Sequence, residues 1–191
     1  MRDIREIAEL LDALEGQPTS SLEAQDLDFK EWNRRSPASA VDLVVEMAVC
    51  MANGGGGTVV FGVNDKTVGR AGAIRGVPPE IDVNRLKKAV YDGTDPKLTP
   101  VFQELPVPEG TGRLLVMQIH PGLPPYTDTQ GRGKIRVGTD CQPLTGTLRR
   151  YAQFAELLCE PPEAEADPSC WNPAQLMPFT KNSSCVDAPS F

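Results

Sequence analysis

Two basic side chains in the last third of the chain are spaced for contact with a phosphate backbone. Lys134 and Arg136 alternate with Ile135 and Val137, a pattern typical of a short β-strand with one apolar face. If the apolar pair points inward, the two cations project from the opposite face about 6.6 Å apart, since a strand rises roughly 3.3 Å per residue. Successive phosphates of one nucleic-acid strand are separated by a similar distance.

Further side chains are candidates for the same contact. We expect a phosphate-contacting group made of Lys30, Arg34, Arg35, Arg132, Lys134 and Arg136. Contacts of this kind position a nucleic acid without reading its base sequence. The rings of Trp32 and Tyr126 are suited to stacking on bases, although burial in the core is an equal alternative for Trp32. The competing interpretation for the cations is an ordinary solvated face.

Four consecutive glycines, residues 54–57, invite comparison with a phosphate-binding loop. Backbone amides without side chains can approach an anion closely. The run lacks the lysine of a GxxxxGK[ST] motif, and it follows a predicted helix and precedes a strand, which reverses the order of dinucleotide-binding motifs. The sequence therefore favours a structural role, in which the glycines end the helix and form a tight turn.

The apolar periodicity predicts the elements that carry these residues. Helices are expected over residues 2–15, 38–52, 81–91 and 147–158. Strands are expected over residues 27–31, 58–63, 101–107, 114–119 and 134–137, with weak strand character over 67–77. Leu27 and Phe29 are expected to bury one face of the first strand, and the third and fourth strands to form a hairpin. The order predicts an α/β protein of the α+β kind, with a mixed sheet flanked by helices.

Three segments are expected along the chain. Residues 1–16 form an amphipathic helix that packs on the main domain or on a protein partner. Residues 17–159 form one domain, since a chain of 191 residues can bury one core of ordinary size. Residues 160–191, rich in Pro, Ser, Glu, Asn and Ala, are expected to form a mostly disordered tail.

The overall charge opposes nucleic-acid binding, but its distribution does not. The net charge is -7, whereas contact with a polyanion needs a basic surface. Residues 1–15 and residues 161–191 each carry a net charge of -3. The central part of the chain is therefore nearly neutral and can present a basic face.

The cysteines and the N-terminus predict a cytoplasmic protein. The chain has five cysteines without CxxC spacing, and its N-terminus lacks the apolar core of an export signal, so reduced thiols are expected. A zinc site is not expected, because His120 is the only histidine. The longest apolar run, residues 41–52, is too short to cross a membrane and is interrupted by Asp42 and Glu46.

Three segments, taken in order, resemble one family. They are Glu23–Lys30, Ala52–Asp65, and Tyr126 followed by Lys134–Gly138. Together, over about residues 20–146, they resemble the Schlafen-type Alba-like domain, which is described as DNA-binding or associated with divergent ATPases. The resemblance implies a mixed-sheet fold related to the small nucleic-acid-binding protein Alba, an intracellular location, and contact with DNA or RNA. ATP binding is implied by the family description alone.

The resemblance also implies an active site. In the nuclease branch of the family three carboxylates form the catalytic centre, and the matching positions here are Glu23, Asp28 and Asp65. Clustered carboxylates can hold Mg²⁺ or Mn²⁺, which polarises a phosphodiester and activates a water. Lys30 leaves the same strand face as Asp28 and can meet the scissile phosphate. Asp28 departs from the family pattern, which usually has glutamate there, and the alternative is a surface pair of Asp28 with Lys30 and a turn shaped by Asp65.

Three functions follow from these observations. The first is a module that binds the phosphate backbone of DNA or RNA, expected to act as a homodimer. The second is a metal-dependent endoribonuclease that uses the three carboxylates. The third is a regulatory role, in which the acidic N-terminal helix and the acidic tail bind a protein partner or shield the basic face.

Overall fold

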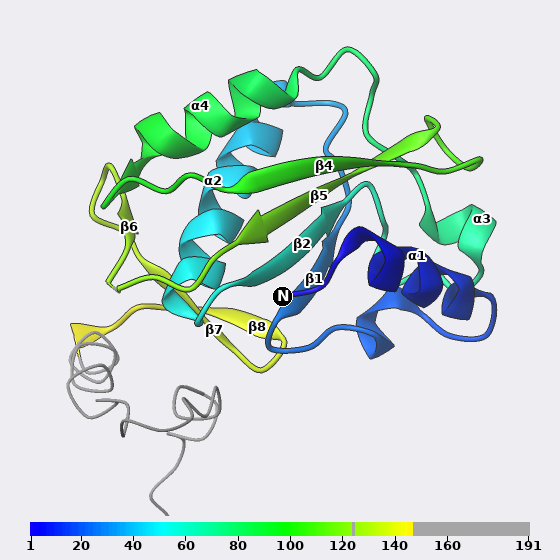
Figure 1. Cartoon of the computed structure of the whole chain (residues 1–191), viewed down its shortest axis with the longest axis horizontal. Helices are drawn as coiled ribbons and strands as arrows, with labels where there is room; N and C mark the ends of the chain where they lie inside the picture. Colours follow the sequence, from blue (N-terminus) through cyan, green and yellow to red (C-terminus); the bar gives the residue numbers. More distant parts are fainter. Residues whose placement is uncertain (124, 147–191) are drawn as a thin grey trace, which may run out of the picture.

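The computed structural model describes residues 1–123 and 125–146 (Figure 1). Its α-helices are α1 (Ile4–Asp12), α2 (Pro37–Asn53), α3 (Arg70–Ala73) and α4 (Val83–Gly93), and two 3-10 turns span Ala13–Glu15 and Thr19–Ser21. Its strands are β1 (Leu27–Lys30), β2 (Gly57–Phe61), β3 (Thr94–Asp95), β4 (Val101–Pro106), β5 (Arg113–Ile119), β6 (Thr127–Asp128), β7 (Lys134–Val137) and β8 (Asp140–Pro143). The helix expected over 147–158 and the tail expected over 160–191 lie outside the described residues.

Four strands form the main sheet, in the order β1-β2-β5-β4. β1 and β2 are parallel, whereas β2 with β5 and β5 with β4 are antiparallel. A parallel pair needs a long crossover connection, and α2 supplies it between β1 and β2. The fold is thus the mixed α+β sheet flanked by helices that the sequence predicts, and the expected hairpin of β4 and β5 is confirmed.

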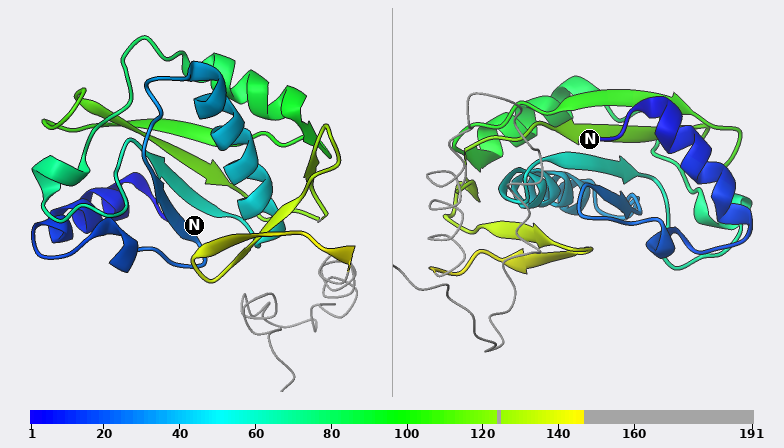
Figure 2. Two further views of the ribbon diagram at one scale, coloured as in Figure 1. Left: turned by 180° about the vertical axis from the view of Figure 1, so that it is seen from behind. Right: turned by 60° about the horizontal axis from the view of Figure 1, so that its bottom comes forward.

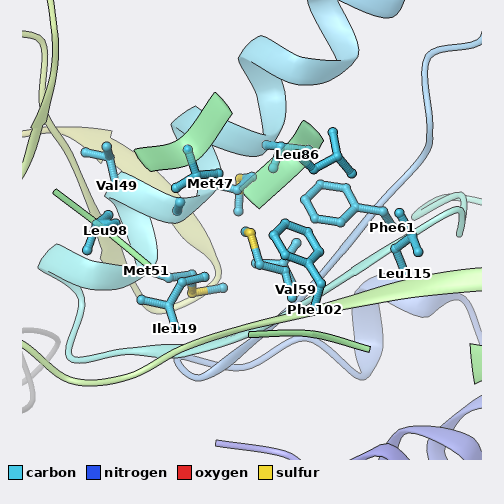
Figure 3. Close-up of a cluster of buried hydrophobic side chains, with 14 of the residues drawn as sticks. Met47, Val49, Met51, Val59, Phe61, Leu86, Leu98, Phe102, Leu115 and Ile119 are labelled. Carbon is cyan, nitrogen blue, oxygen red and sulfur yellow. The ribbon is translucent and has the colours of Figure 1, made fainter. Parts of the chain in front are cut away.

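Each face of the sheet is covered by different helices. α2 and α4 pack on one face, behind the sheet in Figure 1 and in front of it in the reversed view of Figure 2. Figure 3 shows the core on that side, where Met47 of α2 and Leu86 of α4 meet Val59, Phe61 and other strand residues. α1 covers the opposite face, because Ile7 and Leu11 cluster there with other fully buried side chains.

Local sequence explains where α2 begins and ends and where α1 begins. Ser36 caps α2 by accepting a hydrogen bond from the Ser39 N–H, and Pro37 fits the first helical turn, where no amide partner is needed. Gly54 then ends the helix. In α1 the Asp3 and Glu6 side chains form a reciprocal capping box, which satisfies two free amides of the first turn.

A separate two-stranded hairpin lies against the C-terminal end of α2. Its strands are β7, as expected, and β8, which the alternation of apolar residues does not reveal. Arg136 of β7 lies opposite Cys141 of β8 in the register. A second small ribbon pairs β3 with β6. In place of the weak strand expected over 67–77, the structure has the short helix α3, followed by a single bridge from Ile74 to Val63.

Two cysteines are joined, which corrects the expectation of reduced thiols for this pair. Cys50 of α2 and Cys141 of β8 form a disulfide with Cα atoms 5.9 Å apart. They are 91 residues apart in sequence and share no motif, so spacing along the chain carries no signal of the pairing. Over residues 1–123 and 125–146, no helix has the length and apolar character needed to span a membrane.

Candidate functional site

A cluster of buried charges lies on the α2 side of β1. Asp28 is 0% exposed, and its carboxylate accepts hydrogen bonds from Lys30 Nζ at 2.7 Å and from the Arg136 guanidinium at 3.0 Å. Asp28 and Lys30 therefore share one strand face, as the sequence predicts. The alternative of a surface pair is wrong, because β7 supplies an arginine that covers the Asp28 carboxylate.

Glu23 belongs to the same cluster. Burial raises the pKa of the Glu23 carboxyl from 4.5 to about 7, and a hydrogen bond with Asp28 and the negative charge of Asp28 act in the same direction. Lys30 and the Phe29 N–H, which donates to Glu23 at 3.3 Å, oppose this rise. Glu23 therefore holds a proton at mildly acidic pH, and the neighbouring Asp28 carboxylate lies against two cationic side chains.

Arg136 does not project into solvent, so the prediction that it shares an exposed face with Lys134 is wrong. It is 1% exposed, and its guanidinium also donates to the carbonyls of Ala24 and Leu27 at 3.2 and 3.1 Å. Ile135 is buried, as the apolar alternation predicts. The strand is covered on both faces, however, which the alternation alone does not predict.

The three predicted carboxylates do not form one group. Asp65 follows β2 in a turn where its carbonyl accepts from the Ser20 N–H, and it does not join Glu23 and Asp28. Within the part of the chain that the structure describes, no three His, Cys, Asp or Glu side chains are grouped to hold a metal ion. Because both oxygens of Asp28 already accept from cations, the residues present do not fit Mg²⁺ or Mn²⁺.

Two other predicted phosphate contacts have carboxylate partners. Arg132 pairs with Asp128 at 2.7 Å, and Lys134 pairs with Glu46 at 2.7 Å. Burial raises the pKa of Asp128, but hydrogen bonds from Arg132 and the Gln130 N–H outweigh it, and the pKa lies below its usual range. These cations line a depression of about 1040 Å³ together with acidic residues, so the predicted common basic surface does not extend there.

Three arginines meet in an open groove beside the end of β1. Arg34 and Arg35 come from the loop before α2, and Arg75 comes from the segment after α3. The groove has a volume of about 650 Å³ and includes Glu31 as its one acidic residue. Across residues 1–123 and 125–146, no carboxylate forms an ion pair with any of the three arginines.

The groove is held in shape by local hydrogen bonds. The Arg34 guanidinium donates to the carbonyl of Arg75, which links its two walls. The Asn33 side chain accepts from the N–H groups of Arg35 and Ser36 and thereby fixes the turn that leads into α2. Trp32 lies beneath this turn, 5% exposed and edge-on to Phe61, so its ring is a core residue and not a stacking platform.

Arg75 is a residue of the groove that the sequence pattern does not reveal. It lies 40 positions beyond Arg35, in a segment without a clear pattern, and only the fold brings it to the same groove. The glycines after α2 have the structural role that the sequence favours. A Cβ at Gly54 would lie 2.5 Å from the Arg136 Cβ, so glycine allows the helix end and β7 to approach closely.

Tyr126 and Asn53 connect the helix end to the last strands. The Asn53 side chain donates to the carbonyls of Tyr126 and Lys134 and accepts from the Tyr126 N–H, at 2.7 to 2.8 Å. Tyr126 is partly buried and packs against the α2-side core. It is thus far better placed to support the fold than to stack on a base.

Comparisons with known proteins agree with this fold. The profile described as Schlafen, AlbA_2 matches residues 23–145. The DIP2311 protein from Corynebacterium diphtheriae is similar, with 27% identity and a TM-score of 0.56 over 73% of this chain and 26% of that one. This chain thus spans about a quarter of the length of that protein. No curated protein matches the chain.

A second solved structure is the N-terminal domain of a Nitrosomonas europaea protein described as related to the ATP-dependent DNA helicase RecG. It is 21% identical, with a TM-score of 0.43 over 68% of this chain and 82% of that one. The family profile covers well over half of the chain, and the three segments with which the sequence resembles the Schlafen-type Alba-like domain all lie within it. The chain therefore belongs to the Schlafen AlbA_2 family.

Proposed function

We propose that the protein binds the phosphate backbone of a nucleic acid in the arginine groove of Arg34, Arg35 and Arg75. The observation that supports this most strongly is that three guanidinium groups share one open groove without carboxylate partners there in the described part of the chain. Guanidinium is always charged and presents paired donors that match phosphate oxygens. The family resemblance supports the same class of ligand.

The groove is suited to backbone contact and not to base reading. Its aromatic residue, Trp32, is buried, and the three arginines carry all the positive charge of its lining. Sequence reading requires side chains placed against base edges, whereas phosphate contact does not. We therefore expect similar affinity for nucleic acids of different sequence, with strong dependence on salt.

The expected salt dependence follows from the number of cations. Three phosphate contacts give a slope of log K against log salt of about -2.7 for duplex DNA and about -2.1 for a single strand. Between 50 and 200 mM salt the affinity should fall roughly 40-fold for the duplex and roughly 20-fold for the single strand. A fluorescence anisotropy titration with labelled 20-nucleotide strands and duplexes measures both values.

Glutamine variants test the groove directly. Arg34→Gln, Arg35→Gln and Arg75→Gln each remove one charge and keep hydrogen-bonding capacity, and each should reduce the slope by about 0.7 to 0.9. Arg85→Gln is the matched control, because Arg85 is 89% exposed on α4, outside the groove, and has only a 4.0 Å contact with Asp82. Equal slopes for the groove variants and the control would place the interface elsewhere on the molecule.

Cleavage is measured in the same samples. Transfer RNA and duplex DNA are incubated with the protein, with and without Mn²⁺, and binding and cleavage are separated on gels. The metal-dependent nuclease stays a prediction from the family resemblance, since the residues that the structure brings together do not fit the ion. Mn²⁺-dependent cleavage that is lost in Asp28→Asn, with folding intact, would establish the enzymatic function.

A further inference from the structure

We propose that the Cys50–Cys141 disulfide is a redox-reactive site at which small thiols release the β7–β8 hairpin from α2. The bond joins two elements that the main sheet does not connect, since among the described strands β7 and β8 pair only with each other. In Figure 1 the hairpin lies at the lower end of α2, beside β1. The disulfide is therefore the one covalent link, within residues 1–123 and 125–146, that ties the hairpin to the rest of the fold other than through the backbone.

The position of the bond in the hairpin matters. Cys141 lies directly opposite Arg136 in the β7–β8 register, and Arg136 carries the charge that reaches Asp28. The disulfide thus holds the residue pair of the hairpin, Arg136 with Cys141, that brings Arg136 into the buried charge cluster. Closing the bond fixes Arg136 over Asp28, and opening it leaves this contact to non-covalent forces alone.

Those non-covalent forces comprise the burial of Ile135, the ion pairs of Arg136 and Lys134, and hydrogen bonds from two side-chain amides. The Gln25 side chain donates to the Arg136 carbonyl and accepts from the Gly138 N–H, at 2.9 and 2.7 Å. Asn53 donates to the Lys134 carbonyl. Because net contributions of single hydrogen bonds are modest, the hairpin should open locally far more often once the covalent link is gone.

The two cysteines differ in exposure. Cys50 is 0% exposed, whereas Cys141 is partly buried and borders Met47. A small thiolate therefore attacks Cys141 Sγ. The Cys50–Cys141 bond breaks, a mixed disulfide forms on Cys141, and Cys50 leaves as a thiolate that takes up a proton.

A second small thiolate completes the exchange. It attacks the small-molecule sulfur of the mixed disulfide, so that Cys141 is released as a thiolate and an oxidised dimer of the small thiol forms. Two thiols thereby supply the two electrons that reduce the protein disulfide, and the reverse reaction with a low-molecular-weight disulfide restores it. The site accepts a small thiol better than a large protein thiol, because Cys50 is buried and Cys141 is only partly exposed.

The test uses the full chain with Cys159, Cys170 and Cys185 changed to serine, so that only the pair remains. The protein is equilibrated in glutathione buffers from oxidising to reducing, and thiols are alkylated and mapped by mass spectrometry. We expect the disulfide in oxidising buffer, and a glutathione adduct that forms on Cys141 before any forms on Cys50. An adduct found first on Cys50, or two free thiols in oxidising buffer, would overturn the proposal.

Hydrogen exchange of the same samples tests the structural consequence. Reduction should raise the exchange rates of residues 134–143 by about tenfold or more, and in the reduced protein these residues should exchange faster than those of β2 and β5, which open only when the whole domain unfolds. Cys141→Ser in the same background is the matched variant, and it should exchange like the reduced protein in both buffers. Equal exchange of the hairpin in oxidised and reduced protein would show that the bond does not hold it. The wild-type chain, measured in parallel, checks that the three serine changes are neutral.

Discussion

Replacing Arg136 by methionine should destabilise the protein strongly, because it leaves the buried Asp28 carboxylate with Lys30 as its one cationic partner among the described residues. Asp28 and Arg136 are 0% and 1% exposed, so neither is compensated by water. Removing one partner of a buried pair raises the free energy of the folded state by about 3 to 5 kcal/mol. The loss includes the two carbonyls, of Ala24 and Leu27, that accept from the same guanidinium.

A loss of this size is a large part of the stability of one domain, which is typically about 5 to 15 kcal/mol. Urea unfolding followed by circular dichroism measures it. With a slope of about 2 kcal/mol per molar urea, the midpoint should fall by roughly 1.5 to 2.5 M. Lys30→Met is the control, and its effect should be clearly smaller, because Lys30 is 30% exposed while Arg136 is buried.

The double variant Asp28→Asn with Arg136→Met separates pairing from packing. If the arginine acts through the charge of Asp28, the asparagine should restore a large part of the loss, since no buried charge is left without its partner. The reasoning would be refuted if the stability loss of the double variant equalled the sum of the two single losses. A loss under about 1 kcal/mol for Arg136→Met would refute it as well.

Three further outcomes are expected. Glu23 binds its proton more tightly in the folded protein, so its contribution to the free energy of unfolding is fully present below pH 4.5 and is lost as pH rises to about 7. Urea unfolding across that window should show the free energy of unfolding fall, and Glu23→Gln should remove this pH dependence. Gly54→Ala should lower stability by about 1 to 3 kcal/mol because its Cβ would overlap the Arg136 Cβ, whereas Gly16→Ala, with nothing within 4 Å, should be near neutral in the same assay. Reduction should lower the free energy of unfolding by about 4 to 5 kcal/mol in the chain-entropy account, since the disulfide closes a loop of 91 residues, and an unfolding midpoint that does not move with dithiothreitol would contradict this.

Local pattern predicts most of the sheet and the helix between its parallel strands. Val59 and Phe61 belong to a β-prone run, and the apolar spacing of α2 ends at Asn53, where the glycines begin. These features depend on neighbours in sequence, which is why they were predictable. The alternation of side chains along a strand placed Asp28 and Lys30 on one face, and the family resemblance implied the mixed sheet.

The site was less predictable, because its contacts are long-range. Arg136 reads locally as an outward cation of an alternating strand, and only contact with a carboxylate 108 residues earlier makes it a buried residue. The Cys50–Cys141 pair and the position of Arg75 depend on tertiary structure in the same way. The basic character of Arg136 marked it as a candidate, but the direction of its side chain and its carboxylate partner could not be predicted from spacing.

The separation of Asp28 from Arg136 also bears on how the chain matures on the ribosome. At about 5 to 20 residues per second, Arg136 is synthesised roughly 5 to 20 s after Asp28. During that interval β1 cannot settle against α2 without enclosing a carboxylate that lacks its arginine. The nascent chain should therefore keep its first strand hydrated until the β7–β8 hairpin emerges, and a chaperone that binds the nascent chain would meet an unpaired strand edge throughout that time.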